Sequence, residues 1–98
     1  MGRKQFAAAH LYRLRNEIDI NRLIQYELKL EWKINEGYLR FLCPQCSEFN
    51  TATKRETNLA RCFRCRVNFN PIDMVMAVKG INFIEAVNYL KDYLPDII

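Results

Sequence analysis

Four cysteines constrain this chain more than any other feature of its sequence. They form two pairs, Cys43-Pro44-Gln45-Cys46 and Cys62-Phe63-Arg64-Cys65, with fifteen residues between the pairs. This spacing is typical of a tetrahedral zinc site, in which each pair forms a tight turn that presents two sulfurs to one metal ion. Because four protein ligands leave no coordination position for water, such a zinc ion is structural rather than hydrolytic. We therefore predict one structural Zn²⁺ held by Cys43, Cys46, Cys62 and Cys65.

Other roles for these cysteines agree less well with the sequence. Two disulfides would require an oxidising compartment, and the first twenty residues contain only a short apolar run, residues 6–9, between basic residues, which is no signal peptide. A thioredoxin-like redox site would need one pair and not two. An iron–sulfur cluster also uses four thiolates and stays open as an alternative. No apolar run is long enough to cross a membrane, so we expect a cytoplasmic protein without a membrane partner.

Length and charge narrow the interpretation further. The 98 residues fit a single domain, and in so small a domain a bound metal supplies stability that the core alone lacks. The chain has 15 basic and 11 acidic residues, a net charge of +4, which by itself is weak evidence for a nucleic-acid partner. The basic excess is concentrated on the predicted zinc-binding segment, where only Glu56 opposes five cations: Lys54, Arg55, Arg61, Arg64 and Arg66.

Hydropathy patterns divide the single domain, residues 1–98, into three parts. Residues 1–27 are predicted to be helical, with a first helix over residues 4–16 and a second that Asp19 caps. Residues 28–70 alternate apolar and polar positions around the cysteine turns, which predicts a zinc ribbon with an antiparallel sheet of about four to five strands. Residues 71–94 are predicted to form a helix pair, with caps at Asn70 and Asn82 and an end at Gly80. The predicted fold class is α+β.

One strand prediction concerns the core. In the alternation that begins this second part, four apolar residues are expected to face inward, and Trp32 is expected to be a core residue: Leu28, Leu30, Trp32 and Ile34.

The order of these elements resembles the zinc-binding domain of bacterial DnaG-type primases, the CHC2 zinc-ribbon family. The resemblance covers about residues 17–94 and is carried by Ile18-Asp19-Ile20 with Leu23-Ile24, Cys43-Pro44 with Cys46, Cys62-Phe63 with Cys65, and residues 70–74. Cys46 stands where the family usually has histidine, which keeps four ligands and adds one negative charge. Arg64 and Arg66 stand near the second turn, where the family has glycines. The family's Lys-Thr-Pro-Ser-Phe stretch is replaced by Phe49-Asn50-Thr51-Ala52.

This resemblance implies a bacterial, phage or mobile-element protein that takes part in primer synthesis. The catalytic part of such primases has clustered acidic residues that hold metal ions, whereas the 11 acidic residues here are dispersed without an Asp-x-Asp pair. The single histidine, His10, is expected to be an ordinary helix residue. We therefore expect no enzyme, but an accessory protein of DNA replication that acts with a separate polymerase, primase or helicase subunit.

A surface for single-stranded DNA is predicted on the ribbon. On the expected hairpin, strand parity places Lys33, Tyr38 and Arg40 on one outer face, beside the basic segment. Basic residues interleaved with aromatic rings suit a single strand, because the charges follow phosphates and the rings stack on bases. The predicted binding residues are Lys33, Tyr38, Arg40, Lys54, Arg55, Arg61, Phe63 and Arg64. The alternative is a zinc-ribbon adaptor that binds a protein partner, with apolar helix residues such as Leu11 and Tyr89 as further contacts, and whose basic face is merely solvated.

Overall fold

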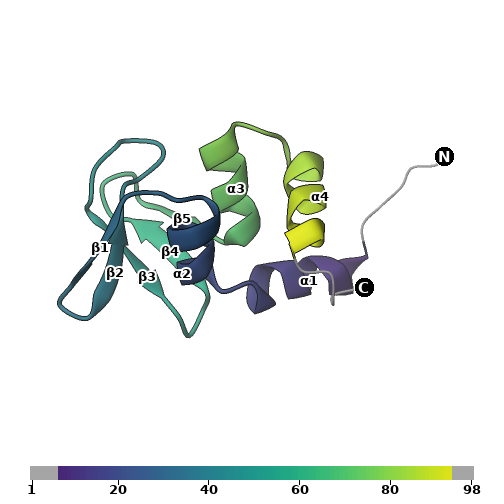
Figure 1. Ribbon diagram of the computed structural model, residues 1–98, viewed down its shortest axis with the longest axis horizontal. Coiled ribbons are helices and arrows are strands. Elements are labelled where there is room, and N and C mark those ends of the chain that lie inside the picture. The colour runs from purple at the N-terminus through teal and green to yellow at the C-terminus, as the bar shows by residue number, and fades with distance from the viewer. Residues whose placement is uncertain (1–6, 94–98) are drawn as a thin grey trace.

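The structure, a computed structural model, describes residues 7–93 without the side chain of Tyr93. Helices and strands follow one another as α1 (Ala8–Glu17), α2 (Ile20–Arg22), the π-helical turn η1 (Leu23–Glu27), β1 (Trp32–Asn35), β2 (Tyr38–Phe41), β3 (Thr51–Lys54), β4 (Leu59–Cys62), β5 (Val67–Phe69), α3 (Pro71–Lys79) and α4 (Phe83–Tyr93). The strands lie at one end of the molecule, α1 and α4 lie towards the other, and α3 lies between them (Figure 1). The predicted α+β class is confirmed, with the five strands divided between two antiparallel sheets, β1-β2 and β3-β4-β5.

The N-terminal helices bury one face each. The first helix begins at Ala8, and the predicted start at residues 4–6 lies outside the described residues. Asp19 caps α2 as predicted, because its carboxylate accepts a hydrogen bond of 2.9 Å from the backbone N–H of Asn21. Apolar residues of α2 and η1 recur with helical spacing, and they are fully buried: Ile20, Leu23 and Ile24.

The first hairpin is shorter than the sequence pattern predicted. Helical structure continues to Glu27 and ends with Leu28 as its C-cap, and Lys29 has a left-handed backbone (φ 55°), so the first strand starts only at Trp32. Two residues, Glu36 and Gly37, connect it to β2, and both have positive φ (56° and 82°). Positive φ at both positions is the type I′ geometry, whose twist matches that of paired strands.

The expectation that Trp32 belongs to the core is wrong. Its side chain is 41% exposed and that of Ile34 is 62% exposed, although both lie on the hairpin face that also carries buried Leu39 and Phe41. The expectation that Ile34 faces inward is wrong as well, whereas Leu28 and Leu30, which precede the strand, are partly buried against the core. Within this hairpin, the apolar side chains of β2 lie in the core and those of β1 do not.

A buried threonine joins the two sheets. The hydroxyl of Thr51 accepts a hydrogen bond of 2.8 Å from the backbone N–H of Phe41 and donates one of 2.6 Å to its carbonyl oxygen. A side chain thus satisfies the backbone groups that a neighbouring strand would otherwise pair. Thr51 also lies opposite Cys62 in the β3-β4 register, which brings the hairpin next to the second cysteine turn.

The turn between β3 and β4 holds the N-terminal helices in place. The side-chain carbonyl of Asn58 accepts a hydrogen bond of 2.9 Å from the N–H of Ile20. Its amide group donates to the carbonyl oxygens of Arg15 and Ile18, at 2.8 and 2.7 Å. These carbonyls lie where α1 ends, so one turn residue supplies partners for backbone groups that helix ends leave unpaired.

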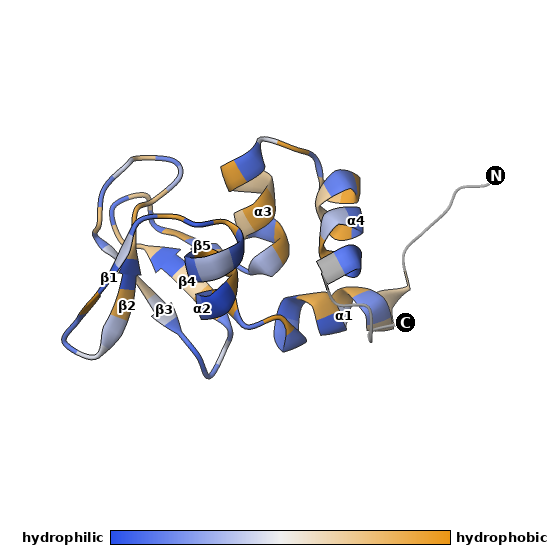
Figure 2. Cartoon of the chain, in the orientation of Figure 1, coloured by the Kyte–Doolittle hydropathy of each residue, from blue (hydrophilic) through white to orange (hydrophobic). Residues whose placement is uncertain are grey.

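The C-terminal helices follow their predicted caps. Asn70 and Asp73 form a reciprocal capping box at the start of α3, and Gly80 ends that helix in the left-handed conformation (φ 65°). Asn82 and Glu85 exchange side-chain and backbone hydrogen bonds of 2.8 and 3.0 Å at the start of α4. Hydrophobic and hydrophilic residues alternate along α1 and α4 (Figure 2), as expected for helices with one buried face.

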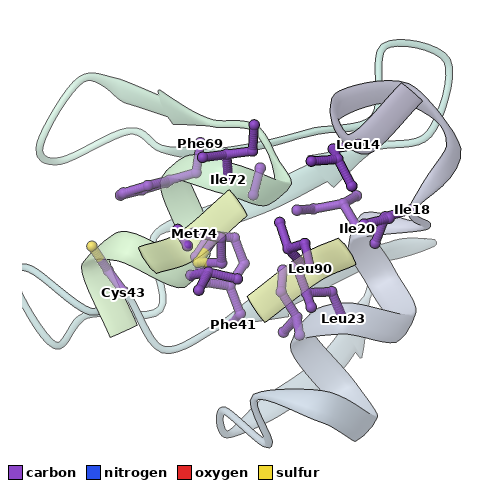
Figure 3. Packing of buried hydrophobic residues seen from close by; sticks show 14 of the residues in the cluster. Leu14, Ile18, Ile20, Leu23, Phe41, Cys43, Phe69, Ile72, Met74 and Leu90 are labelled. Carbon is purple, nitrogen blue, oxygen red and sulfur yellow. The ribbon is translucent and has the colours of Figure 1, made fainter. Parts of the chain in front are cut away.

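One hydrophobic core unites these elements. It draws residues from all the helical segments and from β2, β4 and β5, among them Leu14, Phe41, Met74 and Leu90 (Figure 3). Cys43 and Cys62 belong to this cluster and are 1% and 0% exposed. Two of the four predicted metal ligands are therefore anchored in the packed interior, while Cys46 and Cys65 are half-buried.

Candidate metal centre and basic groove

The two cysteine pairs lie in turns of the same construction. The N–H of Ser47 donates to the carbonyl of Cys43 at 2.9 Å, and the N–H of Arg66 donates to the carbonyl of Cys62 at 2.8 Å. Ser47 and Arg66 each follow the second cysteine of a pair, and both have φ 61°, a left-handed conformation. That conformation favours glycine, so both residues adopt a backbone that is unfavourable for a residue with a Cβ atom.

The four sulfur atoms fit a single tetrahedral metal ion. All four Sγ atoms lie within 4.8 Å of one another. The Sγ atoms of Cys43 and Cys65 are 4.0 Å apart, and those of Cys46 and Cys62 are 3.6 Å apart. Zn–S bonds of about 2.3 Å give a tetrahedron with sulfur–sulfur edges of about 3.8 Å. Both separations are close to this edge and far longer than a disulfide bond.

Backbone amides around the sulfurs prepare them for the metal. The N–H of Gln45 points at Sγ of Cys43 (3.3 Å) and the N–H of Cys65 at Sγ of Cys62 (3.4 Å). Such donors stabilise thiolates, the form that binds metal. Burial raises the pKa of Cys62, but the N–H of Cys65 and the neighbouring thiols outweigh it and lower that pKa to about 7.

The thiols of Cys65 and Cys43 hold their protons more tightly when no metal is bound. Burial, followed by hydrogen bonds with the neighbouring thiols, raises the pKa of Cys65 to about 12. Burial likewise raises the pKa of Cys43. A bound cation reverses this preference, because it offsets the repulsion among crowded thiolates.

Comparison with known families decides the identity of this cysteine site. The family described as CHC2 zinc finger matches residues 6–95, nearly the whole chain. The chain belongs to the CHC2 zinc finger family. None of the curated proteins compared with it matches. In this CHC2 zinc finger the donor set is four cysteines, and the predicted cofactor, one structural Zn²⁺, is confirmed by the family and by the sulfur geometry together. Zinc bound here ties the two turns together and supplies no position for a reacting water.

Most of the predicted DNA-binding residues line one groove. It has a volume of about 900 Å³ and runs beside the β1–β2 and β3–β4 turns. Six of the eight predicted residues contribute to its lining: Tyr38, Arg40, Lys54, Arg55, Arg61 and Phe63. Lys33 and Arg64 are not among the lining residues. Lys33 nevertheless lies opposite Arg40 in the hairpin register, so these two residues share a face as predicted.

Basic and aromatic side chains pair with each other in and near the groove. The guanidinium carbon of Arg40 lies 5.7 Å from the ring centre of Tyr38, and that of Arg61 lies 5.7 Å from the ring centre of Phe63. Outside the groove, the Lys33 ammonium lies 4.9 Å from the ring centre of Phe49. Tyr38 and Phe63 are 53% and 46% exposed. Two aromatic surfaces next to positive charge are therefore open to a ligand.

The groove cations differ in how strongly the protein itself engages them. Arg61 donates to the side-chain carbonyl of Asn68 at 3.2 Å, and Arg55 forms a 3.6 Å ion pair with Asp19 while 75% of its side chain stays exposed. The Arg40 side chain is only 21% exposed. Strand parity predicted the outward direction of Arg40, and the basic segment suggested Arg55 and Arg61, but neither signal indicated the protein partners of these side chains. Asn21 and Asn68, which also line the groove, were not predicted.

Two further observations bear on the remaining predictions. None of the helices within residues 7–93 combines the length and apolar character needed to span a membrane.

The Tyr89 hydroxyl donates to the carboxylate of Glu27 at 3.1 Å, and the Lys79 ammonium lies 5.0 Å from the Tyr89 ring centre. Tyr89, which was predicted to contact a partner, therefore helps to hold α4 against η1.

Proposed function

We propose that this CHC2 zinc finger binds single-stranded DNA in the basic groove and assists a separate polymerase or primase subunit in primer synthesis. The observation that carries the proposal is the gathering of four cations and two exposed aromatic rings in one groove. Cations follow the phosphates of a single strand and aromatic rings stack on its bases. Family membership supports a primase-type role for the zinc module.

The accessory role rests on the distribution of metal-binding side chains. Within residues 7–93, the only group of three or more such side chains is the set of four cysteines. Two carboxylates near the groove are paired with cations, Asp19 with Arg55 and Glu36 with Arg40. Phosphoryl transfer requires carboxylates that hold magnesium ions. The proposal therefore places catalysis in another polypeptide.

Titration of labelled single-stranded DNA at several salt concentrations tests the proposal. We expect the logarithm of the association constant to fall with the logarithm of salt, by about 0.7 for each phosphate contact. Lys54→Ala and Arg61→Ala should each weaken binding and flatten this dependence. Lys79→Ala removes the same charge from α3, away from the groove lining, and is the matched control. Absence of binding by the zinc-loaded parent at low salt would refute the proposal.

A second candidate function is a protein-interaction adaptor, and one observation favours it. Trp32 and Ile34 are 41% and 62% exposed on the hairpin face opposite Lys33. Contiguous exposed apolar surface can mark a site of protein contact. Capture of a polymerase subunit that is lost with Ile34→Lys, together with no binding to DNA, would favour the adaptor.

A further inference from the structure

Arg40 is the groove cation that is most engaged in contacts within the protein. Its Nη1 donates to the carbonyl oxygen of Thr51 at 2.9 Å, its Nη2 contacts the Glu36 carboxylate at 3.5 Å, and its guanidinium covers the Tyr38 ring at 5.7 Å. The Arg40 side chain is 21% exposed, against 75% for Arg55. A guanidinium has five N–H donors in one plane, and here its two terminal nitrogens face a carbonyl and a carboxylate of the same chain.

The contacts of Arg40 connect the hairpin to the second sheet. Strand β2 belongs to the two-stranded sheet and Thr51 begins β3 of the other sheet. The Thr51 hydroxyl holds the backbone of Phe41, and the Thr51 carbonyl holds the side chain of Arg40. Two successive residues of β2 are thus fastened to one residue of β3. Arg40 also reaches Glu36 in the hairpin turn, so its side chain spans from the turn to the second sheet.

Tyr38 lies between Glu36 and Arg40 in the sequence. It is the first residue of β2, directly after the turn, and its half-exposed ring lines the groove. A phosphate that bound both terminal nitrogens of the guanidinium would compete with the Thr51 carbonyl and the Glu36 carboxylate for the same N–H donors. Lys54 and Arg61 have weaker contacts within the described residues. Lys54 is exposed, and Arg61 donates to the neutral amide of Asn68 beside the Phe63 ring.

We infer that Arg40 is a positioning residue: it fixes the Tyr38 ring for base stacking and does not bind a phosphate. This inference rests on the proposed function and deepens it, because it separates the groove residues into two kinds. Lys54 and Arg61 contribute charge to the bound strand. Arg40 contributes the orientation of one aromatic surface.

The salt dependence of binding distinguishes the two kinds of residue. Using labelled oligothymidylate and the zinc-loaded chain, we expect Arg40→Ala to weaken binding about as much as Tyr38→Ala, roughly 5-fold to 10-fold for one stacked base. Neither variant should change the salt slope, because a stacked ring releases no counterions. The double variant Arg40→Ala/Tyr38→Ala should bind like either single variant. Lys54→Ala should flatten the slope by about 0.7.

Amide hydrogen exchange provides a readout without DNA. In Arg40→Ala, exchange should accelerate in β1 and β2 while β4 and β5 keep the protection of the parent. Three results would each overturn the inference: a flatter salt slope for Arg40→Ala, additive effects of Arg40→Ala and Tyr38→Ala, or unchanged hydrogen exchange in the hairpin. If the parent still binds the oligonucleotide, the proposed function is unaffected by these results. If the parent itself does not bind the oligonucleotide, the proposed function fails, and the binding role of Arg40 fails with it.

Discussion

Asn58 accepts a hydrogen bond from the backbone N–H of Ile20 at 2.9 Å, across 38 positions of the sequence. The same side chain donates to two carbonyl oxygens where the first helix ends. A single residue in the β3–β4 turn thereby fixes how the N-terminal helices meet the ribbon. It also has a left-handed backbone (φ 57°), a conformation that asparagine tolerates better than most residues.

Removal of the Asn58 side chain should destabilise the protein substantially. Asn58→Gly keeps the left-handed backbone but loses three hydrogen bonds, so we expect a loss of about 2–4 kcal/mol in the free energy of unfolding. Asn58→Ala should lose more, because a Cβ atom adds strain at positive φ. Denaturant unfolding of the zinc-loaded chain measures both, with Thr57→Ala in the same turn as the control. Stability within 0.5 kcal/mol of the parent, about the usual effect of a surface substitution, would contradict this role.

The hydroxyl of Thr51 should be needed for the junction between the sheets. Thr51→Val keeps the shape of the side chain but leaves the buried N–H and carbonyl of Phe41 without their hydroxyl partner. We expect a loss of about 2–4 kcal/mol and faster hydrogen exchange at the Phe41 amide. Thr51→Ser retains the hydroxyl and removes one methyl group, so it should lose only about 1 kcal/mol. Equal losses in the two variants would show that packing, and not the hydroxyl, holds the junction.

Zinc binding should release protons at neutral pH. The pKa of Cys65 is raised to about 12 and that of Cys43 is also raised from 9.0, so both thiols are protonated before zinc binds and ionised afterwards. We expect at least two protons released per zinc ion. Calorimetric titration in two buffers of different ionisation enthalpy measures this number, and a value below one would contradict the assigned pKa directions.

The direction of each shift also sets the pH dependence of the metal-free fold. A raised pKa favours the protonated thiol in the fold, so the contribution of Cys65 is complete below pH 9 and is lost as the pH rises towards 12. A lowered pKa favours the thiolate, so the contribution of Cys62 is present above pH 9 and is lost as the pH falls through 7. Zinc affinity should fall steeply as the solution is acidified below pH 7, because the thiolate of Cys62 is then lost as well.

Glycine at position 66 should stabilise the second cysteine turn. Arg66 has φ 61°, a conformation that costs a residue with a Cβ atom about 1–2 kcal/mol. Part of this gain is offset by the greater freedom of glycine in the unfolded chain. We expect Arg66→Gly to raise the free energy of unfolding by about 0.5–1 kcal/mol. Arg64→Gly removes the same charge from a residue without positive φ and should destabilise; a gain in both variants would indicate an effect of charge instead.

The sequence predicted those features that depend on local chemistry. Cysteine spacing predicted the metal ligands, and the caps at Asp19, Asn70 and Asn82 predicted three helix starts, because a cap is a contact between residues two or three positions apart. Alternation correctly predicted that Lys33 and Arg40 share a face. It placed Trp32 in the core wrongly, because alternation gives the direction of a side chain and not whether another element covers it.

The contacts that shape the groove could not be predicted in this way. Asn58 and Ile20 meet only in the folded chain, and so do the Arg40 side chain and the Thr51 carbonyl. No local pattern distinguishes an arginine that is free to bind a ligand from one that a distant carbonyl already occupies. Most of the groove lining that the proposal uses was therefore predictable as a set of residues, whereas the contacts within that set required the structure.

The place of Thr51 opposite Cys62 has a consequence for the cell. A series of contacts leads from the hairpin that carries Tyr38 to a cysteine that holds the metal. Phe41 is hydrogen-bonded to Thr51, Thr51 is paired with Cys62, and Cys62 is paired with Val67. Loss of zinc would loosen the third member of this series and, through Thr51, the attachment of the hairpin. A cell short of zinc would then lose the groove together with the metal, so that zinc supply would set the fraction of molecules in which the groove is intact.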